Sequence, residues 1–149
     1  MMNLKIYISL FVIVFILIGC TKKPTHIDLE ISSSKEVNYD QDKVSSPLML
    51  VFYELSSADK FSKYEYWDII DDKDNKLKLD VISQSKFIIL PNELQTYKIV
   101  FDENTKYLGI IAKFSDIKDA KWRHIIDLEK DTYNESELKI KKYSIVEED

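Results

Sequence analysis

A series of short apolar segments separated by polar turns is the feature that most restricts the fold of this sequence. In each segment, apolar residues either alternate with polar ones or form a short continuous run, which is typical of β-strands. These segments are residues 26–32, 48–55, 77–82, 86–90, 97–101, 107–114, 122–128 and 137–146. Strands at this spacing predict an all-β fold, a sandwich of about seven or eight strands.

One helical insertion is expected after the second of these strands. Two serines at 56–57 offer an N-cap, and large apolar residues then recur every third position. They are Phe61, Tyr64, Trp67 and Ile70. We expect this stripe to pack against the sheet, because such a pattern is more often core than a ligand-binding surface.

Several further segments have specific expectations. The polar stretch 33–46 is longer than most connections inside a domain, which is typical of functional or disordered loops. Gly109 inside a strand predicts a bulge or the close approach of a packed side chain. The apolar positions of the last strand change parity, which predicts a bulge near Lys141, and its lysines suit an edge strand. Alternation also places Trp122 and His124 on one strand face.

The N-terminal segment has the features of a secretory signal. One lysine precedes an apolar run from Ile6 to Ile18, which is shorter than the about 20 residues of a membrane-spanning helix. The run ends in Leu-Ile-Gly-Cys at 17–20, and Cys20 is the only cysteine. This order resembles a bacterial lipobox, which implies cleavage before Cys20 and its acylation; the alternative is an uncleaved anchor. We therefore predict a signal peptide over 1–19, an acylated tether over 20–25 and a β-sandwich domain over 26–149.

Composition and motifs argue against several function classes. The chain has 21 basic and 26 acidic residues, which argues against nucleic acid as a partner. Its two histidines, His26 and His124, lack the spacing of metal ligands, and it has no nucleophile elbow or glycine-rich phosphate loop. A calcium loop starting at Asp72 fails, because Leu77 and Ser83 occupy its required Gly and Glu positions. We expect no catalytic residue, metal or cofactor.

Five stretches together resemble the type VI secretion lipoprotein family known as TssJ, VasD or SciN. Residues 47–55 and Phe61 resemble its "P-L-x-V-x-x-Y-x-L…F" segment, and residues 64–70 its helical insertion. Residues 107–114 are similar to its "Y-L-G-V-V-A-x-F" strand, and Trp122 with Arg123 to its "W-R" pair. The 90–93 turn is similar to its "P-G-E" turn with Asn92 replacing glycine. The family's Asn-Pro after the first strand is also changed, since Tyr39 follows Asn38.

The resemblance implies a transthyretin-like β-sandwich held in the bacterial outer membrane by acyl chains, facing the periplasm. Thr21 is consistent with this location, because an aspartate there retains lipoproteins in the inner membrane. The resemblance also implies binding to the periplasmic C-terminal region of the inner-membrane protein TssM, and indirectly to TssL. It places the contact on the loop between the first two strands, at Asn38, Tyr39, Asp40, Gln41, Asp42 and Lys43. The alternative is a generic periplasmic β-sandwich lipoprotein that binds ligands or assists envelope assembly.

Overall fold

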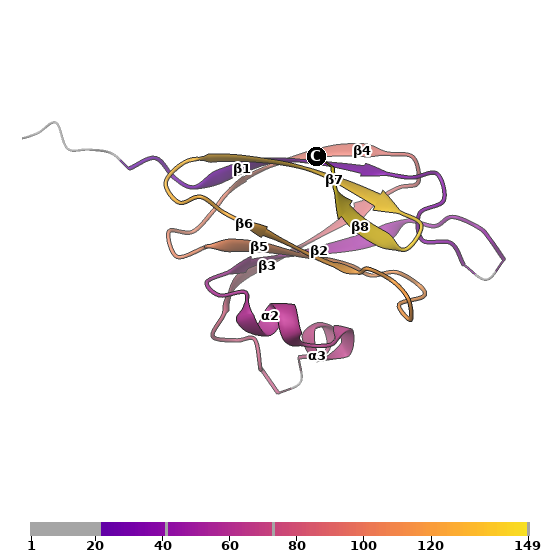
Figure 1. Cartoon of the computed structure of the whole chain (residues 1–149), viewed down its shortest axis with the longest axis horizontal. Helices are drawn as coiled ribbons and strands as arrows, with labels where there is room; N and C mark the ends of the chain where they lie inside the picture. Colours follow the sequence, from indigo (N-terminus) through magenta and orange to yellow (C-terminus); the bar gives the residue numbers. More distant parts are fainter. Residues whose placement is uncertain (1–21, 41, 73, 149) are drawn as a thin grey trace, which may run out of the picture.

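The computed structural model describes residues 22–40, 42–72 and 74–148, so Cys20 and Gln41 lie outside the described residues. The described part forms two four-stranded sheets, in the orders β4-β1-β7-β8 and β3-β2-β5-β6, with two short helices (Figure 1). The elements are β1 (His26–Ser33), β2 (Leu48–Leu55), α2 (Asp59–Lys63), α3 (Tyr66–Ile70), β3 (Val81–Ile89), β4 (Leu94–Val100), β5 (Tyr107–Ala112), β6 (Arg123–Asp127), β7 (Tyr133–Lys141) and β8 (Ser144–Glu147). The predicted all-β sandwich with a helical insertion after the second strand is confirmed.

The main core lies between the two sheets. Alternate residues of β1, Ile27, Leu29 and Ile31, point into it and are fully buried. Strand β2 is buried on both faces, since one face packs in this core and the other lies under the helices (Figure 1). Double burial explains why β2 is a nearly continuous apolar run while β1 alternates.

A second apolar layer lies between the helices and the outer face of the β3-β2-β5-β6 sheet. Phe61 of α2 packs directly over Gly109 of β5, where an added Cβ would lie 2.7 Å from two ring carbons of Phe61. Gly109 pairs in unbroken register with Tyr53 and Ile125. Of the two predictions for Gly109, the close approach is therefore confirmed and the bulge is wrong.

The predicted aromatic stripe of the insertion is only partly correct. Phe61 is fully buried, but Trp67 is 60% exposed, and Tyr66 and Ile69 are the buried residues of α3. The chain is extended at Tyr64 between the two helices, which changes the phase of the second helix relative to the first. The N-cap residue of α2 is Ala58 and not the predicted serine, although Ser57 Oγ accepts a hydrogen bond from the Asp59 N–H at 3.3 Å at the start of the helix.

Three strand predictions need correction. Residues 77–80 form a turn, and β3 runs unbroken from Val81 through the gap expected before residue 86. The last predicted strand is a hairpin, in which a turn at 142–143 restarts the alternation, so no bulge is needed at Lys141. Consequently β7 is internal, and of the two hairpin strands only β8 lies at an edge of its sheet. Trp122 precedes β6 and packs against Tyr66 of the helical layer, with ring centroids 5.2 Å apart.

Strand pairing separates two ends of the sandwich. The register places His26 beside Val100 and Tyr133, and Ser33 beside Ile140. The chain therefore enters β1 from residues 22–25 at one end, which we call the tether end. Four connections gather at the opposite end, which we call the distal end (Figure 1): residues 34–47, 90–93, 113–122 and 142–143. No helix within the described residues is long and apolar enough to cross a membrane.

Candidate partner-binding end of the sandwich

Asn38 fixes the loop between β1 and β2 at the distal end. Its side-chain nitrogen donates to Ser46 Oγ at 2.9 Å and to the Pro47 carbonyl at 3.1 Å, and its Oδ1 accepts from the Ser115 N–H at 2.7 Å. Its backbone N–H donates to the Lys142 carbonyl at 3.0 Å. One residue thus joins three distal connections. Its φ of 51° lies in the left-handed region, which asparagine tolerates better than most residues.

The position of Asn38 assigns it a supporting role within the predicted loop. Its side chain is only 6% exposed, and buried polar groups are costly unless they are hydrogen-bonded. The amide satisfies this requirement within the protein, through bonds to Ser46 and Pro47 of its own loop and to Ser115 of a neighbouring one. Asn38 therefore positions the residues that follow it, and those residues form the accessible surface.

Hydrogen bonds between Asp40 and residues 43–44 close the tip of the loop. The Asp40 N–H donates to the Val44 carbonyl at 3.1 Å, and Asp40 Oδ1 accepts from the Val44 N–H at 2.8 Å. The Lys43 N–H donates to the Asp40 carbonyl at 3.1 Å, and Lys43 has a φ of 60°. Asp42 and Lys43 are exposed, and Val44 is 57% exposed. The predicted loop residues therefore present charge and one apolar side chain to solvent.

Tyr39 connects this loop to the turn between β7 and β8. Its carbonyl accepts hydrogen bonds from Tyr143 Oη at 2.9 Å and from Ser115 Oγ at 3.1 Å. The Lys142 ammonium lies 4.9 Å from the centroid of the Tyr39 ring and 5.4 Å from that of Tyr143, which is within cation–π range. A hollow of about 460 Å³ opens here, lined by Tyr39, Asp40, Ser115, Asp116 and Tyr143.

The arrangement suits recognition of a protein surface. It combines aromatic rings, two carboxylates and one lysine on loops that are held by a rigid sandwich. Sequence analysis missed Ser115, Asp116, Lys142 and Tyr143, which belong to connections far along the chain. No spacing or motif within those segments marks them as neighbours of Asn38.

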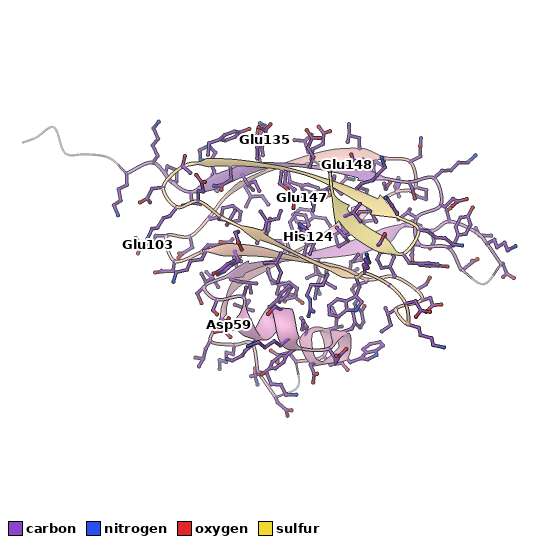
Figure 2. The ribbon with its side chains drawn as sticks, viewed as in Figure 1. Asp59, Glu103, His124, Glu135, Glu147 and Glu148 are labelled. Atoms are coloured by element: carbon purple, nitrogen blue, oxygen red, sulfur yellow. The ribbon has the colours of Figure 1, made fainter. Side chains whose placement is uncertain are left out.

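His124 does not form a catalytic constellation within the described residues. It lies on β6 facing Glu147 of β8, with 3.8 Å between Nε2 and Oε2 (Figure 2). Burial lowers the pKa of His124, and the carboxylate of Glu147 opposes this effect. No cluster of described residues could hold a metal ion, and Asp72 Oδ1 accepts a hydrogen bond from the Lys76 N–H at 2.6 Å.

These features define a class: a β-sandwich with eight strands in the described residues, in which several loops gather at one end. Residues 25–143 match the family model described as "Type VI secretion lipoprotein, VasD, EvfM, TssJ, VC_A0113". The chain belongs to this family of type VI secretion lipoproteins. No match was found among curated proteins.

Solved structures share the fold. TssJ1 from Pseudomonas aeruginosa has a TM-score of 0.77 at 24% identity, covering 85% of this chain and 98% of its own. Serratia marcescens Lip, described as a membrane bound component of the Type VI Secretion System, has a TM-score of 0.77 at 15% identity, with coverages of 85% and 97%. A chain in the structure described as "T6SS protein TssM C-terminal domain (869-1107) from EAEC" has a TM-score of 0.69 at 18% identity, with coverages of 84% and 98%.

Proposed function

We propose that this lipoprotein is anchored in the outer membrane through Cys20, faces the periplasm and binds the periplasmic C-terminal region of TssM with its distal end. It would thereby tether the type VI secretion membrane complex, including TssL indirectly, to the outer membrane. The observation that carries the proposal is the separation of the two ends: the chain enters from the tether at one end, and the recognition loops gather at the other (Figure 1).

A solved neighbour supports TssM as the partner. The structure described by the TssM C-terminal domain (869-1107) contains a chain that shares this fold. The aligned part of this chain, 84% of its 149 residues, covers 98% of the other chain. The other chain is therefore shorter than the span 869–1107. We take the presence of this fold in a structure described by the TssM C-terminal domain as support for TssM as the partner.

The topology also suits a mechanical tether. Residues 20–25 would reach about 20 Å from the bilayer when fully extended, so the sandwich would stay close to the membrane. The tether continues directly into β1, which is paired with β4 on one side and β7 on the other. A pull between the acyl chains and the distal loop would run along the covalent backbone of β1, which the two hydrogen-bonded ladders hold in its extended form. The inner strand position of β1 is therefore well placed to bear force.

Anchoring is tested by Cys20→Ala in cells. We expect the variant to leave the outer-membrane fraction, because acyl chains supply the membrane affinity. Retention of the variant in that fraction would contradict the anchoring proposal. A variant that is released but still captures the TssM region would show that the two parts of the proposal are separable.

Partner binding is tested by replacing residues 40–44 with Gly and Ser while keeping Asn38. We expect capture of the TssM periplasmic region to be lost with little change in melting temperature, since exposed loop tips carry little stability. The matched control replaces residues 103–104, an exposed turn at the tether end, and should leave capture intact. Capture that survives the loop replacement would contradict the loop assignment, and failure of the unaltered chain to capture TssM would favour a generic envelope lipoprotein.

A further inference from the structure

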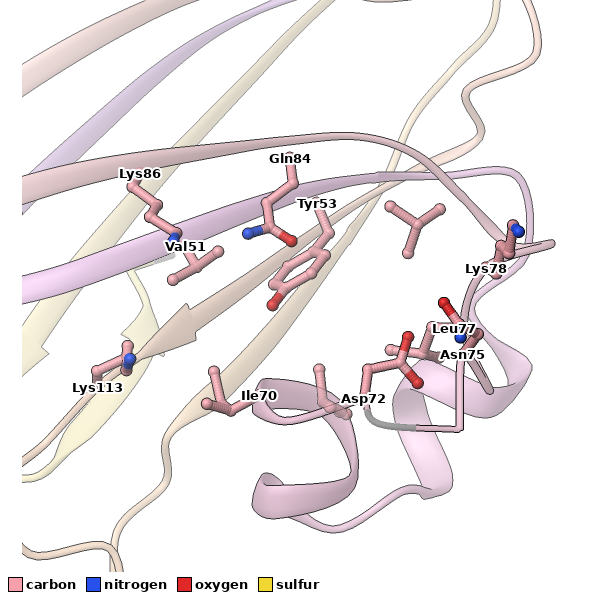
Figure 3. A pocket seen from close by; sticks show the side chains of 12 residues that line it. Val51, Tyr53, Ile70, Asp72, Asn75, Leu77, Lys78, Gln84, Lys86 and Lys113 are labelled. Carbon is pink, nitrogen blue, oxygen red and sulfur yellow. The ribbon is translucent and has the colours of Figure 1, made fainter.

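A cavity lies on the flank of the sandwich, between the helical insertion and the outer face of the β3-β2-β5-β6 sheet (Figure 3). Its volume is about 350 Å³, at the lower end of the range for small-molecule sites. Apolar side chains form much of its wall: Val51, Ile69, Ile70, Leu77 and Val81. None of its lining residues belongs to the hollow at the distal end.

Tyr53 is the feature of this cavity that calls for a ligand. Its side chain points from β2 into the cavity and is 5% exposed, yet its hydroxyl has no hydrogen-bond partner among the described residues (Figure 3). The hydroxyl oxygen itself is not sealed from solvent, and the cavity gives a ligand access to it. Burial, followed by the charge of Asp72 and then Tyr66, raises the pKa of Tyr53 to about 12. The hydroxyl therefore remains protonated at neutral pH and is available to donate a hydrogen bond.

The other polar groups of the cavity are mostly donors. Gln84 and Lys86 of β3 lie beside Tyr53 and Val51 in the strand register, and Lys113 follows β5. Within the described residues, neither lysine has an ion-pair partner and the Gln84 amide makes no hydrogen bond. Asp72 is the one carboxylate among the lining residues that the structure describes, and its Oδ1 already accepts from the Lys76 N–H.

We propose that this cavity binds a small organic anion, a carboxylate attached to a short apolar body. The carboxylate would accept a hydrogen bond from the Tyr53 hydroxyl and interact with the ammonium groups of Lys86 and Lys113. The apolar body would lie against Val51 and Leu77. Charge-assisted hydrogen bonds of this kind are stronger than neutral ones, so the charge of the ligand should dominate its selection.

The test compares three probes of equal shape on the full-length chain in a nonionic detergent. Hydrocinnamate carries the carboxylate, hydrocinnamamide is its neutral counterpart, and the corresponding amine reverses the charge. We expect hydrocinnamate to bind in calorimetry and in ligand-observed NMR, after subtraction of empty micelles, with the amide at least about tenfold weaker and the amine not bound. Hydrocinnamate binding should weaken as salt is raised. Equal binding of acid and amide, or no binding of the acid at about 1 mM, would overturn the proposal.

Two variants test the assigned groups. Tyr53→Phe keeps the ring and removes the hydroxyl, and should weaken hydrocinnamate about tenfold, as expected for a lost hydrogen bond to a charged group. Lys86→Gln alters an exposed side chain and should weaken it several-fold without affecting folding. The matched control, Lys130→Gln, changes an exposed lysine at the tether end and should leave affinity unchanged. Unchanged affinity in both cavity variants would overturn the assignment.

This inference is independent of partner binding. Tyr53 and Lys86 lie outside the distal end, so we expect both variants to capture the TssM region normally. Loss of ligand binding with intact capture would support the cavity proposal alone. Loss of capture on replacing 40–44, with hydrocinnamate binding retained, would support the loop assignment alone.

Discussion

Two long excursions leave the strands of this sandwich, and they are held by different balances of interaction. The loop over residues 34–47 is fixed mainly by hydrogen bonds, above all those of the buried Asn38 amide, with Val37 as its one fully buried apolar side chain among the described residues. The insertion over residues 56–80 is fixed by apolar packing, with Phe61 completely buried and Leu77 2% exposed. Its main polar attachment is Arg123, whose Nη1 donates to the carbonyls of Phe61 and Tyr64 at 2.7 and 2.8 Å.

The difference teaches which excursion belongs to the stable fold and which is positioned for binding. Burying a large apolar side chain contributes about 1.5–3 kcal/mol, whereas a typical hydrogen bond contributes about 0.5–1.5 kcal/mol net. The insertion therefore adds a second core to the sheet. The loop is placed accurately while most of its side chains remain accessible, which is the arrangement expected for a surface that binds a partner.

Truncation of Phe61 should produce the largest effect. We expect Phe61→Ala to lower the free energy of unfolding by about 3–5 kcal/mol, because it leaves a cavity between α2 and β5. Urea denaturation measures the change. Lys63→Ala, on an exposed position of the same helix, should change stability by less than about 0.5 kcal/mol. A Phe61 variant as stable as this control would show that the insertion is not part of the core.

Gly109 tests the same contact from the side of the sheet. Gly109→Ala places a methyl group 2.7 Å from the Phe61 ring and 3.0 Å from Leu55, so we expect a loss of about 1–3 kcal/mol from overpacking. Introducing the change together with Phe61→Leu should reduce this loss, because the aromatic ring is then absent. Equal losses in both backgrounds, measured as a double-mutant cycle, would indicate that the two residues do not couple.

The parts of the fold that sequence predicts are those where side-chain pattern and backbone agree. Double burial makes β2 recognisable as one apolar run, and Gly109 is informative because a strand interior disfavours glycine. The break between α2 and α3 was missed because it depends on extended backbone at Tyr64, which three-residue spacing does not reveal. The turn between β7 and β8 was missed because residues 142–143, Lys and Tyr, carry no turn signal.

The candidate site shows a similar limit. The loop from Asn38 to Lys43 was predicted only through resemblance to a family. Its neighbours could not be predicted from local pattern, since Asn38 and Ser115 are separated by 77 residues and meet because β1, β5 and β7 all end at the same side of the sandwich. The Tyr53 cavity was equally hidden, because Tyr53 resembles any other core residue of β2 until its unpaired hydroxyl is seen.

Replacing Asn38 tests how strongly its hydrogen bonds stabilise the loop. We expect Asn38→Ala to lower stability by about 1–3 kcal/mol, since it removes the buried amide that bonds Ser46, Pro47 and Ser115. Asn38→Gly removes the same amide but relieves the strain of a φ of 51°, so it should cost less. Faster hydrogen exchange at the Ser115 amide in both variants would place the loss at the distal end. A loss of stability equal to that of Phe61→Ala would show that the loop contributes as much to the stable fold as the insertion does.

The smallest effect is expected at the loop tip. Val44 is 57% exposed, so Val44→Ser should change the free energy of unfolding by less than about 0.5 kcal/mol. Capture of the TssM region should nevertheless weaken, because the tip would lose its one exposed apolar side chain. Leu79→Ser is the matched control, since Leu79 is 86% exposed on the insertion and should affect neither property. If the Leu79 variant weakens capture while the Val44 variant does not, the binding surface lies on the insertion, and the roles assigned to the two excursions are reversed.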